Sequence, residues 1–168
     1  MAFSIYDASL PVYIRLLKAL AAILDKAAAH ASEKKIKPEA LVTARLYPDM
    51  FTLAEQVRSA CNHAVRGGAR LSATAVPDFE GKDDTFADLK ARIDWALAYL
   101  ATLKPEQFRD AEDREVVFPV GNGERRLSGR AYLLTFSMPN FMFHTTTAYD
   151  ILRHNGVPLR KADFIGAD

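Results

Sequence analysis

Cysteine is almost absent from this sequence of 168 residues: Cys61 stands alone, so no internal disulfide can form. Because disulfides are a feature of oxidising compartments, a single cysteine favours a reducing, cytoplasmic environment. The sequence also has almost no excess of positive or negative charge, since 22 Lys and Arg stand against 21 Asp and Glu. Proteins that bind nucleic acid generally need a basic face to neutralise phosphates, so we expect no nucleic-acid partner.

Several motifs of known chemistry are also missing. The sequence has no Cys-x-x-Cys and no Glu-x-x-His, which are the spacings of zinc fingers and di-iron bundles. Gly121-Asn122-Gly123 lacks the lysine and the strand-to-helix context of a phosphate-binding loop. The first ten residues carry Asp7 and no basic segment before an apolar run, so we expect no signal peptide. These absences leave open whether the protein is an enzyme.

One uncharged stretch, residues 131–149, contains no Asp, Glu, Lys or Arg and is nearly long enough to span a bilayer. The stretch also contains Asn140, His144 and several Ser and Thr residues. Because polar groups inside lipid are costly, we expect a buried central helix and no membrane partner.

Apolar residues make up 49% of the chain, which is enough for one core. They recur at spacings of three and four in four long segments, and this pattern predicts four long helices. Ser9, Thr52, Thr85 and Ser128 are the predicted N-caps. The predicted helices cover about residues 9–31, 52–71, 85–104 and 129–155, within one domain spanning residues 1–168.

The connections suggest how these helices are arranged. The connector of residues 72–84 can reach about 40 Å, whereas a twenty-residue helix is about 30 Å long. Helices two and three can therefore lie parallel. Residues 115–120 and 124–127 read as a β-hairpin around Asn122-Gly123, and the last dozen residues as an extended tail. The predicted fold is an all-α four-helix bundle with a small hairpin between helices three and four.

His144 is the leading candidate site residue, because it lies in the most apolar helix. Asn140 lies four residues before it, so both side chains share one face. Buried polar groups need partners, and Gln56 and His63 on one face of helix two can supply them. The cluster is either a metal or ligand pocket, or a hydrogen-bonded core pair beside a kink at Pro139; His63 is otherwise a half-exposed histidine.

Several segments resemble one known superfamily. The last helix resembles that of the DinB/YfiT-like bundles. The chain is more closely similar to an uncharacterised bacterial family within that superfamily, described as a domain of unknown function. The resemblance covers almost the whole chain. Its segments are Ser4–Pro11, Leu20–His30, Arg45–Phe51, Asn140–His144, Ile151–Gly156 and Arg153–Leu159.

The resemblance implies a four-helix bundle with parallel second and third helices, often a homodimer. It also implies a divalent metal, commonly zinc or nickel, held by one histidine of helix two and a His-x-x-x-His on helix four. Some members transfer low-molecular-weight thiols to electrophiles. Counted back from Gly156, His144 matches the second histidine of that pair, and Asn140 stands in place of the first. The position on helix two falls near Ser59, one turn from His63.

Only one imidazole of three is kept, and an amide is a poor ligand for such metals. We therefore expect the metal site to be lost or altered, with no resident cofactor, and the pocket to bind a small molecule. One alternative is a metal-dependent thiol transferase or hydrolase with His63 and His144 as zinc or nickel ligands. Another is a structural homodimer whose polar core only sets helix register. The predicted ligand-binding residues are Gln56, Ser59, His63, Asn140 and His144.

Overall fold

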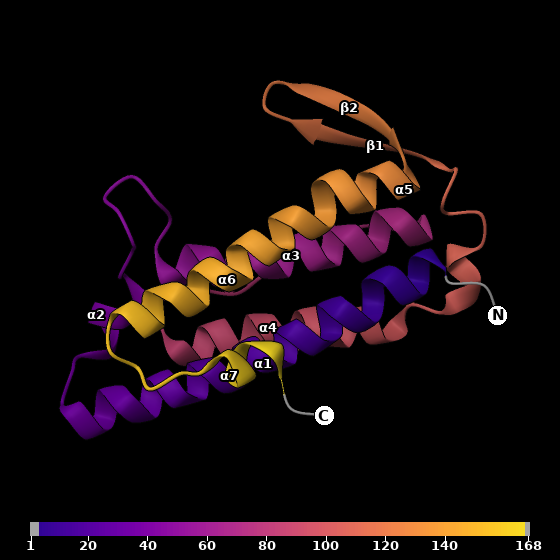
Figure 1. Cartoon of the computed structure of the whole chain (residues 1–168). Helices are drawn as coiled ribbons and strands as arrows, with labels where there is room; N and C mark the ends of the chain where they lie inside the picture. Colours follow the sequence, from indigo (N-terminus) through magenta and orange to yellow (C-terminus); the bar gives the residue numbers. More distant parts are fainter. Residues whose placement is uncertain (1–3, 167–168) are drawn as a thin grey trace.

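The computed structural model describes residues 4–166, and in this part of the chain four long helices lie side by side (Figure 1). The short helix α2 (Pro38–Val42) joins the first two of them. The predicted all-α bundle is confirmed. The long helices are α1 (Ile5–Lys34), α3 (Leu53–Ser72), α4 (Phe86–Thr102) and α6 (Met138–His154).

Capping boxes fix the starts of α3 and α4 where the sequence predicts them. The Thr52 hydroxyl accepts a hydrogen bond from the Glu55 N–H, and the Glu55 carboxylate accepts one from the Thr52 N–H. Thr85 and Asp88 form the same reciprocal pair. Each box satisfies N–H groups that have no partner within the helix.

The predicted start of the first helix is wrong. α1 begins at Ile5, where Ser4 and Asp7 form a capping box. Ser9 is buried inside the helix, and its hydroxyl donates to the Ile5 carbonyl at 2.6 Å. Pro11 also lies inside α1, at an exposed position. There the break in the backbone hydrogen bonds is open to water, which can satisfy the freed carbonyl.

α3 and α4 run parallel, as the long connector predicts. Near the start of α3, Arg58 lies 4.0 Å from Asp83, which precedes α4. Just after α3, the Thr74 hydroxyl lies 2.8 Å from that of Tyr99, near the end of α4. Both helices therefore start at the same end of the bundle, and the connector between them runs back along the length of the bundle (Figure 1).

The core lies between the long helices, and one glycine leaves room for a buried contact between them. A Cβ at Gly67 of α3 would lie 2.7 Å from the Tyr13 hydroxyl oxygen and 2.6 Å from Ser137 Oγ. Those two hydroxyls bond each other at 2.8 Å, so Gly67 leaves room for a buried polar link across the bundle. Core side chains that are 0% exposed include Leu17, Leu24, Leu53, Val57, Leu89, Ile93, Phe141 and Ile151.

The fourth predicted helix is divided into three pieces. α5 (Gly129–Tyr132) is followed by a π-helical turn (Leu133–Ser137) and then by α6. Pro139 is the second residue of α6 and has no N–H to donate. The irregularity predicted at this proline therefore takes the form of a wider turn just before it. No helix within residues 4–166 is both long enough and apolar enough to cross a membrane.

The predicted hairpin lies between α4 and α5. It consists of β1 (Glu115–Val120) and β2 (Gly123–Ser128), paired antiparallel. Because β2 starts at Gly123, the turn consists of Gly121 and Asn122, and the predicted centre at Asn122-Gly123 is wrong by one residue. Gly121 has φ +57°, which glycine adopts without strain.

The C-terminal segment is not simply an extended tail. Gly156 ends α6 with φ +87°, and a short helix, α7 (Lys161–Ile165), follows and packs on α1. Lys26 of α1 forms an ion pair with Asp163 at 2.5 Å. The contact with α1 explains why this short segment becomes helical.

Candidate functional site

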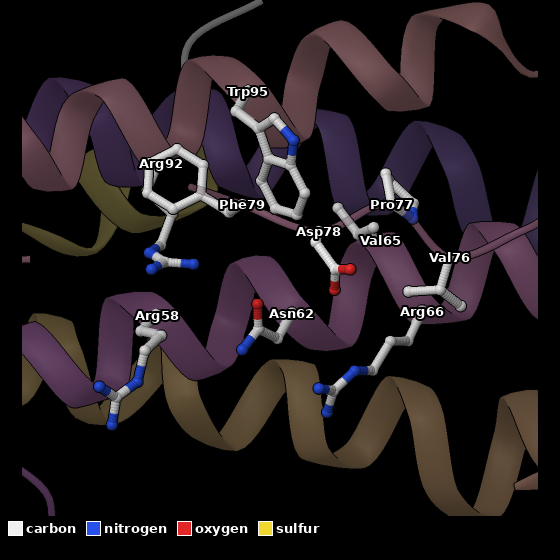
Figure 2. A pocket seen from close by; sticks show the side chains of 10 residues that line it. All are labelled: Arg58, Asn62, Val65, Arg66, Val76, Pro77, Asp78, Phe79, Arg92 and Trp95. Carbon is white, nitrogen blue, oxygen red and sulfur yellow. The ribbon is translucent and has the colours of Figure 1, made fainter. Parts of the chain in front are cut away.

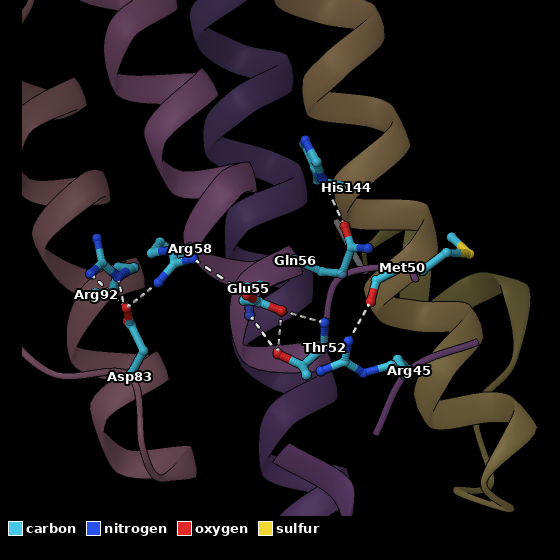
Figure 3. A network of polar contacts seen from close by, with 9 residues as sticks. All are labelled: Arg45, Met50, Thr52, Glu55, Gln56, Arg58, Asp83, Arg92 and His144. Atoms are coloured by element: carbon cyan, nitrogen blue, oxygen red, sulfur yellow. Dashed lines mark hydrogen bonds and ion pairs between the residues drawn. The ribbon is translucent and has the colours of Figure 1, made fainter. Parts of the chain in front are cut away.

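His144 of α6 is held by one hydrogen bond to α3. Its Nδ1 lies 2.7 Å from Oε1 of Gln56 (Figure 3). Because an amide oxygen only accepts, Nδ1 carries the proton, and the lone pair lies on Nε2. Gln56 is 1% exposed and His144 is 9% exposed. The bond is therefore shielded from water and fixes both the orientation and the tautomer of the ring.

His63 forms an imidazole pair with His144. Their ring centroids are 5.4 Å apart, and the planes differ by 19°. Phe51, in the loop before α3, also stacks on His144, at 6.2 Å and 12°. Phe143 meets His144 edge-on at 5.3 Å, and Phe136 lies 6.0 Å from His63. Since Phe51 is 47% and Phe143 54% exposed, the pair lies just beneath an aromatic surface.

Burial keeps both imidazoles uncharged. It lowers the pKa of His63 to about 4, helped by the positive charges of Arg66 and Arg70 and by the repulsion that a protonated His144 would exert. Burial also lowers the pKa of His144. At neutral pH each ring therefore acts as a neutral donor and acceptor of hydrogen bonds.

The structure brings together three of the five predicted ligand-binding residues: Gln56, His63 and His144. Ser59 is half-buried on α3, three residues after Gln56 and four before His63. Asn140 donates its side-chain N–H to the Phe136 carbonyl at 2.7 Å, so this nitrogen is engaged within its own helical segment.

The arrangement does not fit the three-histidine metal centre that the resemblance implies. Within residues 4–166, no three His, Cys, Asp or Glu side chains gather closely enough to hold a metal ion. His63 and His144 supply two neighbouring imidazoles, one fewer than the three protein ligands of a typical catalytic zinc site.

Cys61 does not contribute a nucleophile to this site. Its side chain is 0% exposed, and burial raises the pKa of the thiol to about 12. The reactive form of cysteine is the thiolate, so this thiol is inert at neutral pH.

The aromatic rim is the part of the site that sequence reasoning missed. Phe143 is the neighbour of His144, and Phe51 ends a segment that carries the family resemblance. Both are large apolar side chains that stay exposed. Exposure depends on tertiary packing, so the only signal in the sequence was their closeness to candidate polar residues.

Comparisons with known proteins agree with this fold. The family model described as Domain of unknown function (DUF1993) matches residues 5–165. The crystal structure of a DinB family member protein from Shewanella denitrificans is 38% identical, with a TM-score of 0.90 over 97% of this chain and 92% of that chain. No curated protein matches. The predicted resemblance is confirmed: the chain belongs to the DUF1993 family and has the DinB-like fold.

Proposed function

We propose that the protein binds a small molecule at the imidazole pair, without the three-histidine metal centre that the resemblance implies. One observation carries this proposal: the hydrogen bond from His144 to Gln56, at 2.7 Å, leaves Nε2 of a neutral, shielded ring as an acceptor. Because this nitrogen is shielded and its direction is fixed, it favours a ligand that carries an N–H or O–H donor at the matching position.

The surroundings favour a flat ligand. Phe51 and Phe143 present partly exposed aromatic rings beside His144, and aromatic rings attract other planar rings by stacking or edge contacts. The lowered pKa values of His63 and His144 keep the acceptors unprotonated at physiological pH. The preferred ligand is therefore a small planar ring that carries one O–H or N–H donor.

The two alternatives are supported less well. A metal-dependent thiol transferase or hydrolase needs more converging donors than His63 and His144 supply. A purely structural polar pair in a homodimer core accounts for the Gln56 bond, but it gives no role to the aromatic rim.

A pair of matched probes tests the proposal. Phenol has the ring and the donor, whereas anisole has the ring with the donor capped by a methyl group. Phenol should bind saturably in ligand-observed NMR, and anisole at least tenfold more weakly, because the unmade hydrogen bond costs about 1.4 kcal/mol. His144→Phe should weaken phenol binding at least tenfold, whereas the control His154→Phe, at an exposed position, should not. Equal binding of the two probes, or unchanged binding to His144→Phe, refutes the proposal.

Elemental analysis separates this proposal from the metal-dependent alternative. We expect less than one zinc or nickel ion per chain after mild purification. A full equivalent of metal, lost in both His63→Gln and His144→Gln, would establish a metal centre in place of the proposed ligand site.

A further inference from the structure

A second pocket lies between α3, α4 and the connector that joins them (Figure 2). Its volume is about 250 Å³, which suits a ligand smaller than a typical drug. Neither His63 nor His144 lines this pocket. Its lining includes Arg58, Asn62, Arg66, Phe79, Arg92 and Trp95.

One side of the pocket is a row of polar side chains. Arg58, Asn62 and Arg66 recur every four residues, so they share one face of α3 (Figure 2). Arg66 is exposed and has no hydrogen bond or ion pair with another residue of the described range 4–166. Arg58 lies 3.8 Å from a Glu55 oxygen and 4.0 Å from an Asp83 oxygen, beyond hydrogen-bond distance. Both guanidinium groups therefore keep N–H donors for a ligand.

The opposite side is a preorganised aromatic wall. The rings of Phe79 and Trp95 lie 5.2 Å apart. The guanidinium of Arg92 lies 4.1 Å from the Phe79 ring centroid, and Asp83 holds it with hydrogen bonds of 2.5 and 2.8 Å. Because Arg92 is only 6% exposed, this contact anchors the connector on α4 before any ligand arrives.

The charges of the lining favour an anion with one negative charge. Asp83 neutralises Arg92, so the open guanidinium groups are those of Arg58 and Arg66. Asp78 supplies the one carboxylate among the lining residues, against three lining arginines, and Glu55 and Asp83 reduce this excess from outside the lining by pairing with Arg58 and Arg92. A dianion such as a phosphate monoester would therefore meet stronger repulsion from Asp78 than a monoanion.

We propose that this pocket binds a small aromatic monocarboxylate. The planar fork of arginine matches a carboxylate, and Arg58 and Arg66 flank the Asn62 amide, which can donate a further hydrogen bond. The ring of the ligand would then lie against Trp95 and Phe79. This site shares no lining side chain with the imidazole pair.

Trp95 makes the test direct, because it is the one tryptophan of the sequence. Titration with benzoate should change its fluorescence saturably. The double variant Arg58→Gln/Arg66→Gln should bind benzoate at least tenfold more weakly. The control Arg125→Gln/Arg153→Gln removes the same charge from exposed positions outside the pocket and should bind like the wild type.

Two further ligands test the chemistry on the wild-type protein, so the result does not depend on a variant that folds. Benzyl alcohol, with the ring but no charge, and acetate, with the charge but no ring, should each bind at least tenfold more weakly than benzoate. His144→Phe should leave benzoate binding unchanged, which separates this site from the proposed function. The inference is overturned if benzoate gives no saturable change, if benzyl alcohol binds equally, or if both double variants weaken binding alike.

Discussion

Acid should destabilise this fold through His63. The pKa of this side chain falls from an ordinary 6.5 to about 4 in the folded protein. Between those two values the unfolded chain holds a proton that the folded chain does not. Each step down in pH therefore favours unfolding, and above pH 6.5 the effect vanishes. The stabilising contribution is present at neutral pH and is lost as the pH falls toward 4.

The size of the effect follows from the two pKa values. The full difference corresponds to about 3 kcal/mol, and the part lost between pH 7 and pH 5 is about 2 kcal/mol. His63 is only partly buried, so screening by water makes this an upper value. The lowered pKa of His144 acts in the same direction. Against a typical total stability of about 5–15 kcal/mol, the loss is readily measured.

The assay is urea unfolding at pH 7, 6 and 5, followed by circular dichroism. His63→Gln should lose less stability than the wild type over this range, by at most about 2 kcal/mol. The matched control His154→Gln removes an exposed histidine and should follow the wild type. Glu55 and Asp163, whose carboxyl pKa values are lowered, lose their stabilising effect mainly at lower pH. The same pH dependence in the wild type and His63→Gln would refute the reasoning.

Three other predictions follow from packing. Gly67→Ala would press a methyl group against the hydroxyls of Tyr13 and Ser137 and should lower stability by about 1–3 kcal/mol, seen as a lower Tm. Gly129→Ala would overlap a backbone carbonyl oxygen, which cannot move aside like a side chain; its loss of Tm should exceed that of Gly67→Ala, and a smaller loss would contradict the packing. Cys61 should react with a thiol reagent only after denaturation, so rapid labelling of the native protein would contradict its burial.

Local signals in the sequence predict most of the helix starts, and they fail where two signals compete. Thr52 and Thr85 each precede an acidic residue by three positions, and both caps are where the pattern places them. Ser4 has the same relation to Asp7, whereas Ser9 has no such partner. Reading Ser9 as the cap gave too much weight to Pro11, which α1 tolerates because that position faces water.

The candidate site was likewise only partly predictable from the sequence. Helical periodicity alone places Gln56 and His63 on one face toward His144, and the structure brings these three together. The hydrogen bond from the Asn140 side chain to the Phe136 carbonyl depends on the side-chain rotamer of Asn140, and no pattern in the sequence determines that rotamer. The pocket between α3, α4 and their connector depends on the path of that connector, which the sequence does not specify. A signal for it did exist, because Arg92 interrupts an apolar face of α4 and so needs a buried partner.

NMR of the imidazole nitrogens tests the central claim most directly. The chain has 4 histidines, so a long-range correlation of ring protons with ring nitrogens can resolve each one. At pH 7 we expect neutral rings at His63 and His144, with the His144 proton on Nδ1 and the lone pair on Nε2. A cationic His144, or a proton on Nε2 in place of Nδ1, would contradict the account.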